Sequence, residues 1–95
     1  MTGRDVSEAP PSSLPGLGPK TDAMLAVVGI HSARQLRAQD PFEVYRRLKE
    51  ALPGTSLNAL YALLGALEGR HWLDIRRERR MEVLLRLEQM GLAPR

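Results

Sequence analysis

The residues best suited to chemistry lie in one short stretch, residues 14–28, where a glycine-rich loop runs directly into a helix start. Gly16 and Gly18 carry no Cβ, so the backbone between them can turn sharply and approach a ligand closely. Pro19 suits the first helical position, where an N–H group would have no helical partner. We expect a bound anion to face the Lys20 ammonium group and the helix dipole at this point. The backbone N–H groups expected to be free for this anion are those of Lys20, Thr21 and Asp22.

This stretch resembles the helix-hairpin-helix motif, in which a loop of the form apolar-Pro-Gly-apolar-Gly holds a nucleic-acid backbone without reading bases. The resemblance implies that Gly16, Gly18, Lys20 and Thr21 bind nucleic acid. One feature departs from the motif, because the proline pair at positions 10–11 prevents a helix from leading into the loop. A first helix would have to come from elsewhere in the fold. The same residues also suit an ordinary loop and helix start, so both interpretations stay open.

A second basic feature lies near the start of the last expected helix. Residues 76 and 80 fall on one helical face, so the guanidinium groups of Arg76 and Arg80 could line a strip that binds phosphates. Asp74 and Glu78 interrupt this run, and the mixed charges equally suit a solvated helix surface. The arginines of this run are Arg70, Arg76, Arg77, Arg79 and Arg80. A second candidate strip, with the same two interpretations, consists of Arg34, Arg37, Arg46, Arg47 and Lys49.

Composition restricts the possible classes of function. The 95 residues suffice for one small domain with no deep substrate cleft. The chain has no cysteine and only two histidines, His31 and His71, which excludes a Cys-His pair and a thiolate metal site. We therefore expect no enzymatic activity, no metal and no cofactor. The sequence pI of about 10.0 weakly favours nucleic acid as a partner. Without an apolar run approaching 18 residues, no membrane contact is expected, and the chain is interpreted as cytoplasmic.

The pattern of caps and apolar residues predicts a compact all-α bundle of about five short helices. Residues 1–13 are predicted to be a disordered tail or linker, and residues 14–95 to form the domain. Aromatic residues make up only 4% of the chain, which indicates an aliphatic core. The helix over 57–68 is apolar on nearly all sides, so we place it at the centre. The predicted helices cover residues 19–28, 33–39, 41–51, 57–68 and 75–90.

Three further residues are predicted to have structural roles. The amide of Asn58, one turn inside an apolar helix, is expected to tie down a nearby loop. Gly65 lowers helix propensity, which suggests that a neighbouring helix passes too close for a Cβ. His71 is expected to help close the turn before the last helix, with Trp72 packed on the core.

Several segments in order resemble the C-terminal domain of the TfoX (Sxy) family of DNA-transformation, or competence, regulators. The most specific are Ser-Leu-Asn at 56–58 and Leu-Glu-Gly-Arg-His-Trp at 67–72, since neither follows from a generic bundle. The resemblance runs from about residue 14 to residue 87. It implies a fold similar to helix-hairpin-helix and SAM-like domains, and a role in regulating genes for DNA uptake. Regulators of this family usually carry a separate N-terminal domain, which is not found here, so part of the regulatory role is expected to belong to that domain.

Two functional hypotheses from different classes remain. In the first, the chain is a module that binds the DNA backbone weakly and without sequence preference, through the loop at 16–21 and one arginine strip. In the second, it is a SAM-like interaction domain that docks a protein regulator, either a transcription factor or an N-terminal partner domain. The modest net charge of +3 and the incomplete hairpin motif favour the second slightly. The loop chemistry favours the first.

Overall fold

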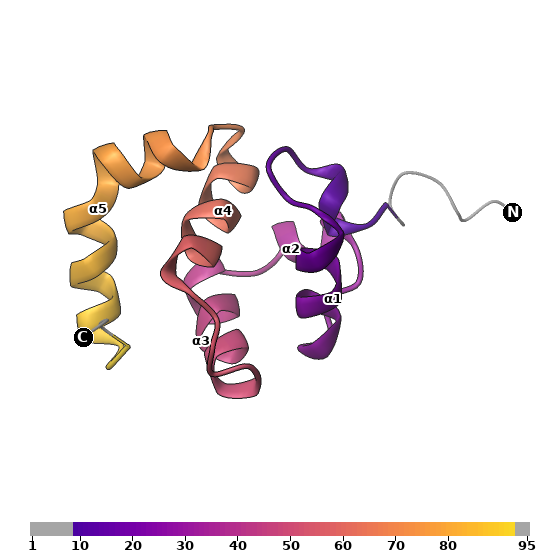
Figure 1. The fold of residues 1–95 in the computed structure, drawn as a ribbon, viewed down its shortest axis with the longest axis horizontal. Coiled ribbons are helices and arrows are strands. Elements are labelled where there is room, and N and C mark those ends of the chain that lie inside the picture. The colour runs from indigo at the N-terminus through magenta and orange to yellow at the C-terminus, as the bar shows by residue number, and fades with distance from the viewer. Residues whose placement is uncertain (1–8, 93–95) are drawn as a thin grey trace, which may run out of the picture.

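The computed structural model describes residues 9–92, and these residues form short helices with no strand among them (Figure 1). This confirms the predicted all-α fold. A short 3-10 helix, η2, precedes the α-helices and spans Pro11–Ser13. The α-helices are α1 (Pro19–Val27), α2 (Ala33–Arg37), α3 (Pro41–Ala51), α4 (Leu57–Glu68) and α5 (Trp72–Gln89).

Side-chain caps explain several of the helix starts. The Asp40 carboxylate accepts from the Phe42 N–H at 2.9 Å and begins α3 at its predicted residue. The Ser32 hydroxyl accepts from the Gln35 N–H at 3.1 Å and begins α2. The prediction for α5 was wrong by three residues, because the His71 ring nitrogen Nδ1 caps the helix and starts it at Trp72 rather than at residue 75.

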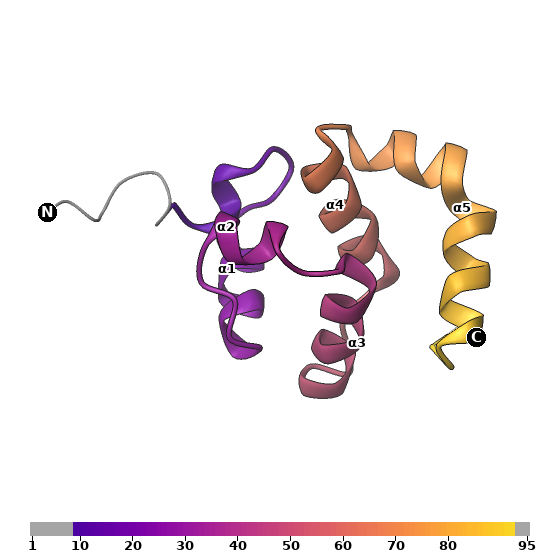
Figure 2. The same ribbon diagram turned by 180° about the vertical axis from the view of Figure 1, so that it is seen from behind.

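Helix α4 lies at the centre of the fold, as predicted from its apolar surface. In both views it stands between α5 on one side and the group formed by α1, α2 and η2 on the other (Figures 1 and 2). Its two faces belong to two separate clusters of buried side chains. Because one helix closes both clusters, its position determines how the rest of the chain packs.

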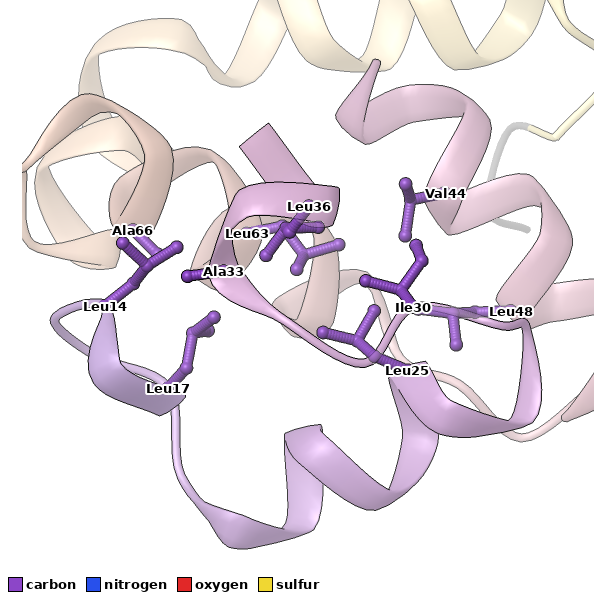
Figure 3. Close-up of a cluster of buried hydrophobic side chains, with 10 residues drawn as sticks. All are labelled: Leu14, Leu17, Leu25, Ile30, Ala33, Leu36, Val44, Leu48, Leu63 and Ala66. Carbon is purple, nitrogen blue, oxygen red and sulfur yellow. The ribbon is translucent and has the colours of Figure 1, made fainter. Parts of the chain in front are cut away.

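The first cluster joins the N-terminal half of the chain to one face of α3 and α4 (Figure 3). It consists of Leu14, Leu17, Leu25, Ile30, Ala33, Leu36, Val44, Leu48, Leu63 and Ala66. The second cluster joins the opposite faces of α3 and α4 to α5. It consists of Phe42, Tyr45, Leu60, Tyr61, Leu64, Ile75, Val83 and Leu87.

The predicted tail is wrong at its C-terminal end. Pro11 is buried, and the carbonyl oxygen of Ala9 accepts from the Ala33 N–H at 2.8 Å, so residues 9–13 pack against α1 and α2. Proline suits this 3-10 turn because Pro11 is its first residue, where an N–H group would have no partner within the turn. Residues 1–8 of the predicted tail and residues 93–95 of the predicted domain lie outside the described residues.

The turn between α4 and α5 contains two of the predicted structural residues. Gly65 is buried in α4 and faces this turn, and its carbonyl oxygen accepts from the Arg70 N–H at 2.8 Å. Trp72 is half-buried against the second cluster and its ring stacks on His71, with the ring centroids 6.0 Å apart. The turn therefore packs against Gly65 of α4 and, through Trp72, against the second cluster.

Candidate nucleic-acid interface

The loop predicted to hold a phosphate has the expected turn but fewer free donors than expected. Gly16 adopts a φ of +85°, a left-handed conformation that favours glycine. Gly18 is the N-cap of α1, and its carbonyl oxygen accepts from the Thr21 and Asp22 N–H groups at 3.0 and 3.2 Å. The expectation that these two N–H groups are free is wrong, because both already donate to Gly18 in the first turn of the helix that begins at Pro19. Of the three, only the Lys20 N–H has no backbone acceptor among the described residues.

A carboxylate already occupies the first turn of α1. Asp22 accepts hydrogen bonds from the Ser12 N–H at 2.8 Å and from the Ser12 hydroxyl at 2.5 Å. The pair holds η2 against α1 and places negative charge where the helix dipole favours it. This charge repels a phosphate at the same helix end. We therefore expect the predicted loop site to bind a phosphate less tightly than its sequence indicates.

A second hairpin has the two flanking helices that the predicted one lacks, although Thr55 and Ser56 stand where the motif has an apolar residue and a glycine. Residues 52–54 repeat the Leu-Pro-Gly of residues 14–16, and here a full helix stands on each side, α3 before the hairpin and α4 after it. We call residues 52–56 the α3–α4 hairpin. The predicted helices over 41–51 and 57–68 end and begin on either side of this segment, which was not predicted to be a hairpin of the motif. The repeated Leu-Pro-Gly between two predicted helices was the pattern that could have revealed it.

Hydrogen bonds fix the shape of the α3–α4 hairpin. The Lys49 ammonium donates to the carbonyl oxygens of Pro53 and Thr55, at 3.0 and 3.2 Å. The buried Thr55 hydroxyl donates to the Leu52 carbonyl oxygen at 2.7 Å. Lys49, expected in the second basic strip, therefore holds the hairpin in place.

The hairpin leaves the N-terminus of α4 open to a ligand. The N-cap residue Ser56 makes no side-chain capping bond, and the first turn has no acidic residue. The N–H groups of Leu57 and Asn58 have no backbone acceptor among the described residues. The Asn58 side chain is exposed and makes no hydrogen bond within residues 9–92. The predicted tether is therefore not formed among the described residues, where the Asn58 side chain is exposed to solvent.

Two hollows meet at this open turn. The first, which we call the hairpin groove, has a volume of about 780 Å³ and brings Lys20 beside the α3–α4 hairpin. The second, which we call the Tyr61 cavity, has a volume of about 280 Å³ and brings Arg76 and Arg80 beside the first turn of α4. Ser56 and Asn58 line both hollows. Lys20 of the predicted loop and Arg76 and Arg80 of the predicted arginine strip therefore all border the N-terminus of α4.

The five arginines of the run at 70–80 divide into paired and unpaired groups. Arg70 pairs with Glu78 at 2.7 Å, and Arg79 pairs with Glu68 and Glu82. The hydrogen bond and charge of Arg79 lower the pKa of Glu82 below its usual value. Arg76, Arg77 and Arg80 are exposed and form no ion pair with another described residue. These three also line one shallow hollow with Leu73.

The second basic strip is largely used within the fold. Besides Lys49, Arg46 pairs with Glu43 at 2.8 Å, and Arg47 donates to the carbonyl oxygen of Val28. Within this strip, only Arg34 and Arg37 are exposed and make neither an ion pair nor a side-chain hydrogen bond with another described residue. The cations around α4 are therefore the better candidate interface.

Among the described residues, neither histidine belongs to a group of metal-binding type. The backbone N–H of His31 donates to the Gln35 amide oxygen at 2.6 Å, and the His71 ring accepts from the Leu73 N–H as the cap of α5. Across residues 9–92, no three His, Cys, Asp or Glu side chains gather closely enough to hold a metal ion. None of the helices in that range combines the length and apolarity needed to cross a membrane.

The family model for the TfoX C-terminal domain matches residues 11–87, which is most of the chain. Its first matched residue is the buried Pro11, in agreement with the packed position of η2. No curated protein and no solved structure matches the chain.

Proposed function

Because the chain belongs to the TfoX C-terminal domain family, we propose that it is a non-catalytic module of a DNA-transformation regulator that binds the DNA backbone. One observation carries the proposal. Lys20, Arg76 and Arg80 converge on the first turn of α4, where two backbone N–H groups lack acceptors among the described residues. Helix N-termini and unpaired cations are the groups that proteins use to contact DNA phosphates.

The proposed contacts go to phosphates rather than to base edges. Arginine and lysine side chains and backbone N–H groups position a protein on DNA but carry no sequence information. We therefore expect weak binding with similar affinity for unrelated sequences. The interface differs from the one expected from sequence, since the α3–α4 hairpin and the start of α4 replace the loop at 16–21 as its centre.

Fluorescence anisotropy with two labelled duplexes of unrelated sequence tests this proposal at low salt. We expect equal affinities for the two duplexes, and we expect Arg80→Gln to weaken both affinities to the same degree. Arg37→Gln is the matched control, because Arg37 is also exposed and unpaired among the described residues but lies on α2. Strong preference for one duplex, or equal losses in both variants, would count against the proposed interface.

A second candidate function rests on the outer surface of α5. Met81 and Leu85 are 74% and 55% exposed and lie four residues apart, so they share one helical face. Such a face suits protein docking, and the candidate partner is a TfoX N-terminal domain or a transcription factor. Isothermal titration with a separately purified TfoX N-terminal domain tests this. Binding that Met81→Ser abolishes supports docking, and absence of any heat of binding contradicts it.

A further inference from the structure

Tyr61 has a buried hydroxyl group that lacks a hydrogen-bond partner. Its side chain lies in α4, and the residue is 2% exposed. Among the described residues, its hydroxyl is the one buried side-chain polar atom without a partner. Buried polar groups are nearly always paired, so an unpaired one requires an explanation. A ligand that supplies an acceptor is one such explanation.

The surroundings of Tyr61 define the chemistry of this ligand. Tyr61 lines the Tyr61 cavity together with Arg76 and Arg80. Helical side chains lean toward the N-terminus of their helix, so we expect the Tyr61 ring to lie beside the first turn of α4. There, Leu57 and Asn58 have N–H groups without a backbone acceptor among the described residues. The Tyr61 hydroxyl, the two guanidinium groups and the two N–H groups can all donate hydrogen bonds to a ligand. No acidic side chain lines the cavity.

We propose that the Tyr61 cavity binds one phosphate group, with the Tyr61 hydroxyl, the Arg76 and Arg80 guanidinium groups and the α4 N-terminus as donors. A phosphate suits this donor set, because it carries negative charge and several oxygen acceptors in one compact group. Two arginines disfavour a cation there. A volume of about 280 Å³ leaves room for one such group. This phosphate site deepens the proposed function. It rests on that function only where the bound phosphate is assigned to DNA.

Titration of the ¹⁵N-labelled full chain with inorganic phosphate tests the site by NMR. The amide signals of Leu57 and Asn58 should shift with added phosphate, and Tyr61→Phe should weaken binding about tenfold. Tyr45→Phe is the matched control, because Tyr45 is a buried tyrosine of the same cluster that does not line the cavity. It should bind phosphate as the wild-type chain does.

Stability separates a binding role of the hydroxyl from a structural one. Without phosphate, Tyr61→Phe should melt at the same temperature as the wild-type chain or higher, because it removes an unpaired buried group. Added phosphate should then stabilise the wild-type chain more than the variant. A Tyr61→Phe variant that melts lower without phosphate would show that the hydroxyl is already paired in the free chain and would overturn the proposal.

The phosphate and DNA titrations can fail separately. If phosphate shifts neither amide, or if Tyr61→Phe and Arg80→Gln both bind phosphate as tightly as the wild-type chain, the site is wrong even when duplex DNA still binds. If phosphate binds as expected but a duplex neither binds nor displaces it, the site stands for free phosphate and the proposed DNA function fails. Competition between duplex and phosphate supports both.

Discussion

The carbonyl oxygen of Arg70 lies against Gly65 so closely that a side chain has no room there. A Cβ built on Gly65 would be 2.5 Å from this oxygen and 3.2 Å from the backbone nitrogen of Trp72. The close neighbour is thus the turn that leads into α5. Because α5 carries Arg76 and Arg80, this contact helps to set where the two arginines meet α4.

Replacing Gly65 by alanine should destabilise the fold. The added methyl group would press on backbone atoms, which cannot move aside as a flexible side chain can, so we expect a loss of about 1 to 3 kcal/mol in the free energy of unfolding. Urea denaturation measures this loss. Gly54→Ala is the control, since a Cβ at Gly54 would meet no atom within 4 Å. Equal stability of the two variants would mean that the turn shifts freely.

Local sequence patterns predicted the helices well, and long-range contacts explain what was missed. The capping residues Ser32 and Asp40 act within a few residues of themselves, so their helices could be predicted from spacing alone. The packed position of η2 depends on Asp22 reaching Ser12 from the next helix, which no local pattern reveals. Similarly, only the fold shows that Arg79 is paired with Glu68. The cations of the candidate interface could be predicted from the sequence. Its centre, at the α3–α4 hairpin and the start of α4, could not.

The Asp22 to Ser12 contact should contribute to stability. Asp22→Ala removes two hydrogen bonds to a charged group and a favourable charge in the first turn of α1, so we expect a loss of about 1.5 to 3 kcal/mol. Asp74→Ala is a suitable control, because Asp74 also lies in the first turn of a helix, α5. Its carboxylate accepts no hydrogen bond from another described residue. Thermal denaturation that gives equal losses for both variants would assign the effect to the helix dipole alone.

Arg86 should anchor the C-terminal half of α5. Its guanidinium group pairs with Asp40 at 2.7 Å and stands 4.4 Å from the centre of the Phe42 ring. We expect Arg86→Gln to cost about 1 kcal/mol, because it loses both an ion pair and a cation–π contact. Arg46→Gln, which breaks an exposed pair within α3, should cost less. The reverse order of the two variants in urea denaturation would contradict this anchoring role.

Stability at high pH should depend on Tyr45. Burial raises the pKa of the Tyr45 hydroxyl above its ordinary value of 10.0. The unfolded chain therefore ionises first as the pH rises, so the stability that neutral Tyr45 contributes is fully present below pH 10.0 and is lost above it. We expect Tyr45→Phe to lose less stability than the wild-type chain between about pH 9 and about pH 11. Parallel losses in urea denaturation would show that other groups govern this range.

The salt dependence of DNA affinity tests the central claim most directly. With about three phosphate contacts around the first turn of α4, the plot of log affinity against log salt should have a slope near −2.7. Lys20→Gln and Arg80→Gln should each make the slope shallower by about 0.9, whereas Arg37→Gln should leave it unchanged. All four chains must have the same circular dichroism spectrum. A slope near zero for the wild-type chain, or one slope shared by all four, would contradict a DNA-backbone interface centred on α4.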